Sequence, residues 1–286
     1  MKAHLVQPAI AWEDKQANRL QVRELLRGAK VEAGDVILLP EMFDTGFSFT
    51  TSTTADADGS TIAFLRELAQ ATGACVLGGR TRPGERAANV MSVVAPGGDL
   101  LAEYQKIHPF SYANEDATFA GGDGLALFEW GGLRFCPAIC YDLRFPELFR
   151  MGLLAGAQAF AIGACWPRPR HEAWRTLLIA RAMENQAWVF GCNRTGNDPK
   201  LEYAGGSMVI DPKGMIRGEL DNRPGVLSMP IDPDAVGAWR AAFPAWKDIR
   251  LIREAPRAGM GAGVTLGPSS SRNVHDSRTR TRPSGG

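Results

Sequence analysis

Short apolar runs alternate with longer amphipathic segments along most of the chain. Runs of strand length occupy residues 4–10, 36–40, 74–79, 90–95, 125–130, 133–140, 157–164, 188–193, 207–211 and 226–231. Other segments repeat apolar residues at the three-to-four spacing of one helix face, namely residues 14–28, 60–71, 146–154, 171–185 and 233–242. Such a mixture predicts an α/β protein with two layers of sheet covered by helices.

One apolar run ends on a cysteine. Residues 133–139 lead directly into Cys140, and Pro146 begins the next helical segment, where a missing N–H is tolerated. This order predicts a thiol at the end of a strand and the start of a helix. Backbone N–H groups there can favour a thiolate and hold an oxyanion, which suits attack on a carbonyl. The competing interpretation is core packing, the usual place of a free cysteine.

Two ionisable residues also stand where apolar segments end. Glu41 follows the run at 36–40, and Lys106 precedes a loop that contains Pro109. Sites are often built at such ends, because the sheet aims a side chain that the loop leaves accessible. Taken singly, each residue would be expected at the surface.

Together these segments resemble the nitrilase or carbon-nitrogen hydrolase superfamily, and most of all its omega-amidase branch. The matching segments, in the family's order within residues 3–250, are LPEMFDTGF (39–47), YQKIHPF (104–110), CYDLRFPELFR (140–150), WPRPR (166–170) and ARAMENQ (180–186). The resemblance implies a four-layer αββα sandwich, with two central mixed β-sheets flanked by helices. It also implies a homo-oligomer, a dimer or larger.

The resemblance assigns a role to each residue of the motifs. Cys140 would be the nucleophile, and Glu41 would take its proton and return it to the leaving nitrogen. Lys106 and the backbone N–H of Tyr141 would face the oxyanion of the tetrahedral intermediate. The expected reaction passes through a thioester acyl-enzyme. It needs no cofactor and no metal.

A second carboxylate is expected beside the lysine. Glu115 matches the place where relatives carry a glutamate that orients the lysine and the substrate, and its neighbour Asp116 is the competing choice. A carboxylate in that place would also keep Lys106 charged.

Other residues of the motifs are candidates for binding the substrate. Phe110, Tyr112 and Trp166 would wall a small-molecule pocket or pack in the core. Arg170, or its neighbour Arg168, would bind a carboxylate of the substrate if it lies near the thiol. Asn193 and Thr195 are further candidates for the lining, whereas structural ion pairs are expected for Arg144, Glu147, Arg181 and Glu184.

The expected substrate is a small ω-amide of a dicarboxylic or 2-oxo dicarboxylic acid, such as 2-oxoglutaramate, 2-oxosuccinamate or succinamate. Hydrolysis of nitriles or N-carbamoyl amines is the alternative within the family, and a non-catalytic binding protein is the alternative outside it. A papain-like mechanism would need His108 as its base, which fits less well than Glu41. A zinc site at Cys136 and Cys140 lacks a second pair of ligands at metal spacing.

Composition agrees with an intracellular enzyme. The 286 residues are 45% hydrophobic and 22% charged, as in an ordinary α/β protein, and the five cysteines lack the spacing of a disulfide framework. No apolar segment reaches the length of a membrane span, and the N-terminus has no signal-peptide core. The sequence therefore predicts a cytoplasmic protein without membrane contact.

The end of the chain differs in kind from the rest. Residues 1–257 read as one hydrolase domain, whereas residues 258–286 are rich in Gly, Ser, Pro and Thr and carry four arginines against one aspartate. Such a segment cannot bury enough apolar surface to order itself, so a disordered basic tail is expected. Nucleic-acid binding by these arginines is the less favoured interpretation.

Overall fold

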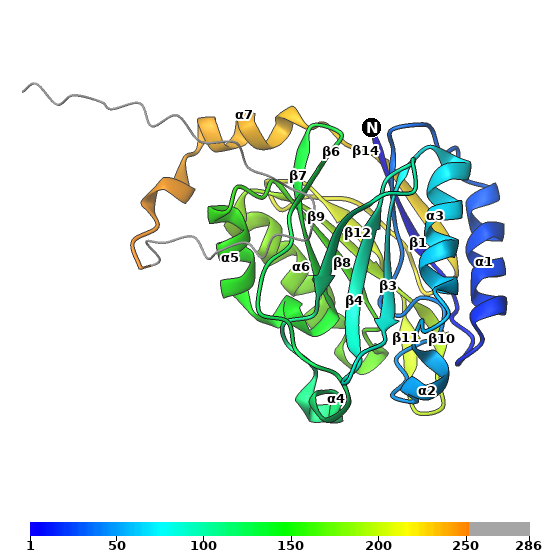
Figure 1. Ribbon diagram of the computed structural model, residues 1–286. Helices are drawn as coiled ribbons and strands as arrows, with labels where there is room; N and C mark the ends of the chain where they lie inside the picture. Colours follow the sequence, from blue (N-terminus) through cyan, green and yellow to red (C-terminus); the bar gives the residue numbers. More distant parts are fainter. Residues whose placement is uncertain (252–286) are drawn as a thin grey trace, which may run out of the picture.

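The computed structural model describes residues 1–251. Two six-stranded sheets lie face to face (Figure 1). From edge to edge, the first consists of β14 (Gly225–Pro230), β1 (Lys2–Gln7), β2 (Val36–Leu38), β3 (Cys75–Arg82), β4 (Ala88–Val94) and β5 (Leu100–Gln105). The second consists of β13 (Ile216–Glu219), β12 (Met208–Ile210), β9 (Trp188–Asn193), β8 (Ala159–Ala164), β7 (Leu133–Ile139) and β6 (Phe128–Trp130).

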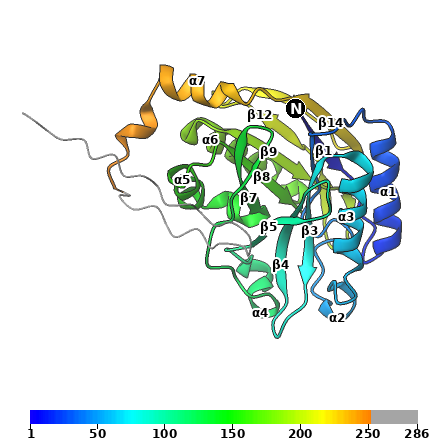
Figure 2. The same ribbon diagram turned by 45° about the horizontal axis from the view of Figure 1, so that its top comes forward.

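Helices cover the outer face of each sheet. In Figures 1 and 2, α1 (Lys15–Arg27) and α3 (Ser60–Thr72) lie outside the first sheet, while α5 (Pro146–Leu154) and α6 (His171–Asn185) lie outside the second. The predicted four-layer αββα sandwich is therefore confirmed. The smaller elements are α2 (Thr51–Thr54), α4 (Glu115–Thr118), α7 (Asp234–Ala242), the hairpin of β10 (Thr195–Asn197) and β11 (Glu202–Ala204), and the 3₁₀ turns η1 (Ser111–Ala113), η2 (Cys140–Arg144), η3 (Arg168–Arg170) and η4 (Ala245–Asp248).

Alternation along the strands builds the core on both faces of the first sheet. In β2, the side chain of Ile37 packs with Val22 of α1 and Leu65 of α3. Its neighbours Val36 and Leu38 belong instead to the cluster that includes the strands of the second sheet. Successive residues of a strand point to opposite faces, so a wholly apolar strand such as β2 belongs in a sheet buried on both sides.

Strand direction brings the candidate residues to one edge. β1, β2 and β3 are parallel, β4 is antiparallel to β3, and β5 is antiparallel to β4, so β5 runs in the same direction as β2. The residues that follow β2 and β5, including Glu41 and Lys106, therefore emerge at the same edge of the first sheet. In the second sheet β7, β8 and β9 are parallel, so Cys140 and Cys165 also share an edge.

The sequence pattern predicted most of these elements. Every expected run and helical segment contains a strand or helix of the predicted type, with ends that differ by a few residues. β1 ends before Pro8 because proline has no N–H to donate to the sheet. The pattern did not predict β5, β10, β11, β13, α2 or α4, which are short or mixed in polarity.

Two sequence predictions concern features beyond single elements. No helix within residues 1–251 is long and apolar enough to cross a membrane. The predicted tail, residues 258–286, and its boundary with the hydrolase domain lie outside the described residues.

Candidate active site

Glu41 follows β2 on a backbone segment that passes close to both sheets. A Cβ on Gly79 of β3 would lie 2.6 Å from the Cα of Glu41, and one on Gly163 of β8 would lie 2.9 Å from the carbonyl oxygen of Leu39. Only glycine leaves room for this approach. The next residue, Met42, has a φ of +43°, a strained conformation for a residue with a side chain. The packing of both sheets thus fixes the backbone that carries Glu41.

Cys140 occupies a strained turn at the end of β7. Its φ is +47°, and it is the first residue of η2, whose last residue lies two positions before Pro146. The sequence argument placed the thiol at the start of the helix that follows; the structure corrects this, because a 3₁₀ turn separates Cys140 from α5. The side chain is partly exposed, unlike the other four cysteines, which are buried.

Lys106 lies between two buried carboxylates. Its Nζ is 2.8 Å from Oε1 of Glu41 and 2.8 Å from Oε2 of Glu115. The side chain of Lys106 is 1% exposed and those of the two glutamates 0%. Glu115 opens α4, and the adjacent Asp116 is exposed. Of the two neighbouring acids, Glu115 is therefore the one that contacts the lysine.

This arrangement raises the pKa of both the lysine and the thiol. Burial alone would lower the pKa of Lys106, but the carboxylates of Glu41 and Glu115 raise it well above its ordinary value. Burial raises the pKa of the Cys140 thiol, and Glu41 raises it further, against a smaller opposing effect of Lys106. The sequence argument expected the turn to favour a thiolate; with these neighbours the thiol is neutral at rest, so its reaction needs a base.

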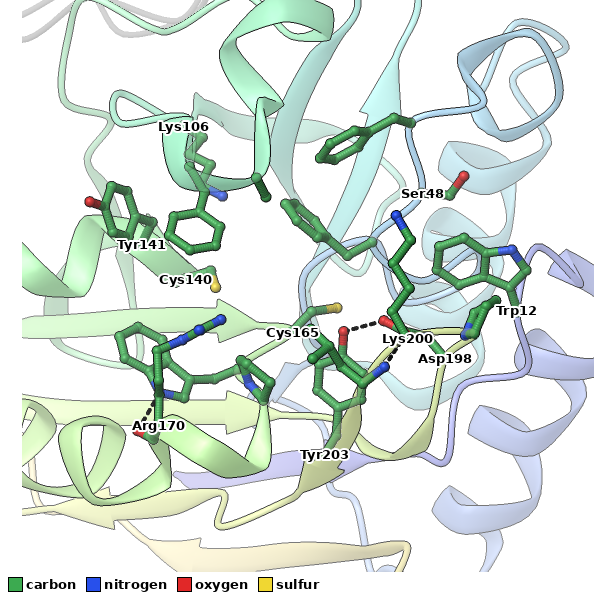
Figure 3. Close-up of a pocket in the computed structure, with 18 of the residues that line it drawn as sticks. Trp12, Ser48, Lys106, Cys140, Tyr141, Cys165, Arg170, Asp198, Lys200 and Tyr203 are labelled. Carbon is green, nitrogen blue, oxygen red and sulfur yellow. Dashed lines mark hydrogen bonds between the residues drawn. The ribbon is translucent and has the colours of Figure 1, made fainter.

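The thiol opens into a cavity of about 480 Å³. Figure 3 shows Cys140 and Lys106 on one side of this cavity, the sulfur of Cys165 directed toward the same space, and Trp12 and Lys200 on the opposite side. The lining is mostly aromatic and apolar, with a few charged groups. Sites for small molecules commonly have this composition.

Two guanidinium groups line the cavity. Arg170 lies over the ring of Phe110, 5.3 Å from its centroid, and Arg144 lies over Trp166 at 4.9 Å. The indole Nε1 of Trp166 donates a 2.7 Å hydrogen bond to the carbonyl oxygen of Arg170, which ties this arginine to the wall. Phe110, Trp166 and Arg170 thus lie where the sequence argument expected them.

Comparison with known proteins agrees with this geometry. The model of the carbon-nitrogen hydrolase family matches residues 2–241. The chain belongs to this family. It is 34% identical over 240 residues to a 2-oxoglutaramate amidase of Bacillus subtilis (strain 168), covering 82% of this chain and 93% of the relative. It is 36% identical over 256 residues to the omega-amidase YafV of Escherichia coli (strain K12), covering 88% of this chain and 98% of the relative.

A solved structure supports the assignment. A carbon-nitrogen hydrolase superfamily protein from Xanthomonas campestris, whose crystal structure has an arsenic adduct in its active site, superposes with a TM-score of 0.83. The two are 35% identical, over 89% of this chain and 98% of the other. The protein is therefore an enzyme, a hydrolase of carbon-nitrogen bonds.

Several predicted lining residues of this carbon-nitrogen hydrolase lie elsewhere. The side chain of Tyr112 is 85% exposed and contributes nothing to the cavity formed by residues 1–251. Asn193 is buried and holds the backbone of Trp166 through its amide oxygen, at 2.8 Å from the Trp166 nitrogen. The hydroxyl of Thr195 donates to the carbonyl oxygen of Asn222 at 2.5 Å. Asn193 thus positions the cavity wall without forming part of it.

The expected ion pairs are present only in part. Arg181 contacts Glu184 at 2.8 Å, as predicted. Arg144 is instead part of the cavity lining, so its assignment to a structural ion pair was wrong. Arg168 pairs with Glu202 at 2.9 Å, which leaves Arg170 as the arginine of η3 that faces the cavity.

Asp142 joins η2, the turn that begins with Cys140, to the loop after β5, a connection that the sequence did not predict. Its Oδ2 accepts hydrogen bonds from the hydroxyl of Tyr104 at 2.8 Å and from the N–H of Ile139 at 2.9 Å. Its Oδ1 lies 2.8 Å from Nδ1 of His108. His108, the base that a papain-like mechanism would need, is thus engaged by Asp142 and stacked on Phe145, outside the cavity lining.

Two further residues of the site were missed, because nothing in their local sequence sets them apart. Asn89, in the apolar strand β4, donates to both Glu41 and Glu115. Cys165, at the end of β8, donates its backbone N–H to Oε2 of Glu41 at 2.9 Å. Within residues 1–251 no group of three or more His, Cys, Asp or Glu side chains is arranged to hold a metal ion.

Proposed function

We propose that this enzyme hydrolyses small ω-amides of dicarboxylic or 2-oxo dicarboxylic acids to the carboxylate and ammonia, through a thioester on Cys140. The observation that carries the proposal is that Cys140 lines a cavity that Lys106 and Arg170 also line. The names of the relatives, a 2-oxoglutaramate amidase and an omega-amidase, support the same class of substrate.

In the first step the thiol of Cys140 attacks the amide carbonyl while its proton passes to Glu41. Because the pKa of Cys140 is raised, deprotonation accompanies attack and no stable thiolate precedes it. The S–C bond forms, and the carbonyl oxygen becomes an oxyanion.

The oxyanion is stabilised by Lys106 and the backbone N–H of Tyr141. The Nζ of Lys106 lies 2.8 Å from Oε1 of Glu41, and 2.8 and 3.1 Å from the two oxygens of Glu115. An ammonium group has three hydrogens, so the longer of the two contacts with Glu115 can be exchanged for one with an oxyanion in the cavity that Lys106 lines. Because the pKa of Lys106 is raised, this donor stays charged throughout the neutral and mildly alkaline range. Loss of one such donor commonly costs about 3 to 4 kcal/mol of transition-state stabilisation.

Collapse of the intermediate breaks the C–N bond. Glu41 returns its proton to the nitrogen, so that ammonia leaves instead of an amide anion. Water then enters, gives a proton to Glu41 and attacks the thioester. The C–S bond breaks, the proton returns to the sulfur, and the carboxylic acid is released.

Arg170 supports the choice of a substrate with a second carboxylate. Its guanidinium is aligned over Phe110 and lines the same cavity as Cys140. A guanidinium binds a carboxylate bidentately, and a charge-assisted contact of this kind contributes about 1.5 to 3 kcal/mol. Arg144 is the second guanidinium in the lining that could take this role, and Lys200 is a further cation there.

Ammonia release from a panel of compounds tests the proposal. Succinamate and 2-oxoglutaramate should be hydrolysed well, and butyramide, which lacks the carboxylate, roughly ten- to a hundredfold less well in kcat/KM. Equal turnover of succinamate and butyramide would rule out a carboxylate-reading pocket. Preferential turnover of nitriles or N-carbamoyl amines would assign the enzyme to another activity of the family.

A further inference from the structure

Asn89 makes an unusual pair of contacts with the two glutamates. Its side-chain nitrogen lies 2.7 Å from Oε1 of Glu41 and 3.0 Å from Oε1 of Glu115. An amide nitrogen carries two hydrogens, so each carboxylate receives one. Asn89 is 1% exposed and is not part of the cavity lining.

The side-chain carbonyl oxygen of Asn89 makes no compensating contact. Oδ1 of Asn89 is buried and has no hydrogen-bond partner among residues 1–251. Leaving a buried polar atom unpaired lowers the stability of the fold. The orientation of Asn89 is therefore explained by what its nitrogen does for the two glutamates.

The contacts also distinguish the two oxygens of Glu41. Oε1 accepts from both Nδ2 of Asn89 and Nζ of Lys106, whereas Oε2 accepts only the backbone N–H of Cys165. Each carboxylate oxygen has about two lone-pair sites. The two donors occupy those of Oε1, so the free site that can take the proton of Cys140 is on Oε2.

We propose that Asn89 is a positioning residue for the proton transfer, which it promotes by occupying Oε1 of Glu41 and thereby presenting Oε2 to the thiol of Cys140. Its second hydrogen holds Glu115 in place on the other side of Lys106. This inference rests on the proposed function, because it concerns the base that activates Cys140.

The test compares wild type with Asn89→Ala by two readouts, each from about pH 5 to about pH 9. The first is kcat and KM for ammonia release from succinamate. The second is the rate at which iodoacetamide alkylates Cys140, measured on the Cys140 peptide by mass spectrometry. Alkylation requires proton removal from Cys140 but no amide substrate. It therefore tests Asn89 even if the proposed substrate is wrong.

Removing a donor from an ionised carboxylate favours its protonation, so the acidic limb of both profiles should move up by roughly one pH unit. On the plateau kcat should fall roughly ten- to a hundredfold. KM should stay within about twofold, because Asn89 does not line the cavity. Ser92→Ala is the matched control: Ser92 is a buried polar residue on the same strand that bonds to Arg80 and Glu103, and its variant should leave both profiles unmoved.

If the acidic limbs of both pH profiles lie at the same pH in Asn89→Ala as in wild type, the proposal is overturned, however much kcat or the alkylation rate falls. If Asn89→Ala does not fold, Asn89→Ser, which keeps one donor, is measured in the same way and should give a smaller shift in the same direction. Failure of both variants to fold would assign Asn89 to the stability of the sheet and would also overturn it. Alkylation of wild-type Cys140 without ammonia release from any amide would instead refute the proposed function.

Discussion

Replacing Lys106 by methionine would remove the ammonium between Glu41 and Glu115 while keeping a side chain of similar length. Both carboxylates are fully buried, and their remaining shared donor would be the amide of Asn89. The substitution should therefore affect the stability of the fold and the chemistry of the site separately.

The two effects can be estimated from the contacts. Removing one partner of a buried ion pair typically costs about 3 to 5 kcal/mol of stability, because the other charge is left uncompensated. Removing the oxyanion donor should lower the acylation rate by about 100- to 1000-fold. Substrate affinity should change much less, because the oxyanion exists only in the transition state.

The pH dependence of stability gives a further check. The pKa of Lys106 is raised in the folded protein, so its contribution to stability is fully present below the ordinary lysine value of about 10.4. That contribution is lost as the pH rises through the higher pKa of the folded state. Wild type should lose stability over this alkaline range by a component that Lys106→Met lacks, as measured by urea unfolding.

Lys106 has two proposed roles, in charge balance and in oxyanion stabilisation. A second variant separates them when its acylation is followed by stopped flow and its stability by equilibrium unfolding. In Lys106→Met/Glu115→Gln the lost positive charge is balanced by a lost negative charge, so stability should largely return. Acylation should remain at least about 100-fold slow, because no ammonium faces the oxyanion. If the double variant acylated at the wild-type rate, the role of Lys106 would be only to balance charge. An unchanged acylation rate with a raised KM in the single variant would make Lys106 a substrate-binding residue.

Four other changes test the remaining parts of the site and the chain. Cys140→Ala should fold and lose ammonia release, whereas hydroxylamine quenching of wild type should trap the acyl group as a hydroxamate; undiminished turnover by Cys140→Ala would refute the mechanism. Arg170→Leu should narrow the preference for succinamate over butyramide by roughly ten- to a hundredfold, and a preference that survives would point to Arg144. Gly79→Ala should reduce both melting temperature and kcat, because its Cβ would meet the Cα of Glu41 at 2.6 Å; wild-type values for both would show that the backbone adapts freely. Removing residues 258–286 should leave activity and melting temperature unaltered, since their composition gives them little to pack with, and a clear loss of either would show that the tail docks.

Local patterns in the sequence indicated two sheets covered by helices and drew attention to residues at strand ends, whereas the four-layer sandwich and the roles of those residues came from the resemblance of the motifs. Glu41 and Cys140 each follow an apolar run, and parallel neighbours bring such ends to one edge of a sheet. Lys106 was placed through the motif around it, since the strand before it, β5, is too mixed in polarity to stand out. The choice between Glu115 and Asp116 needed the structure, because adjacent residues of a short helix point in different directions.

Contacts between distant parts of the chain were beyond the sequence argument. The backbone N–H of Cys165 reaches Glu41 across 124 positions, and the amide of Asn89 reaches it across 48. Asn89 has no local feature that marks it, since it precedes the apolar run at 90–95 and is one of two polar residues in β4. The same limit explains the wrong predictions for Arg144 and Tyr112. Arg144 belongs to η2 and lines the cavity, whereas Tyr112 belongs to η1 and lies at the surface, and only the positions of these two turns around the cavity distinguish them.

The charge balance of the cluster explains why a thiol in this setting depends on a carboxylate base. Two carboxyl groups, those of Glu41 and Glu115, contact the single ammonium of Lys106, and Glu41 also raises the pKa of Cys140. A neighbouring carboxylate opposes the thiolate that backbone N–H groups alone would favour, and the raised pKa of Cys140 follows from burial and from Glu41. The proposed mechanism therefore has the proton leave as the S–C bond forms, when Lys106 would stabilise the charge that moves to the carbonyl oxygen. In the proposed mechanism the carboxylate of Glu41, which raises the pKa of Cys140, also accepts the proton of that thiol, and a carbonyl that lies against Lys106 gains the stabilisation of its oxyanion.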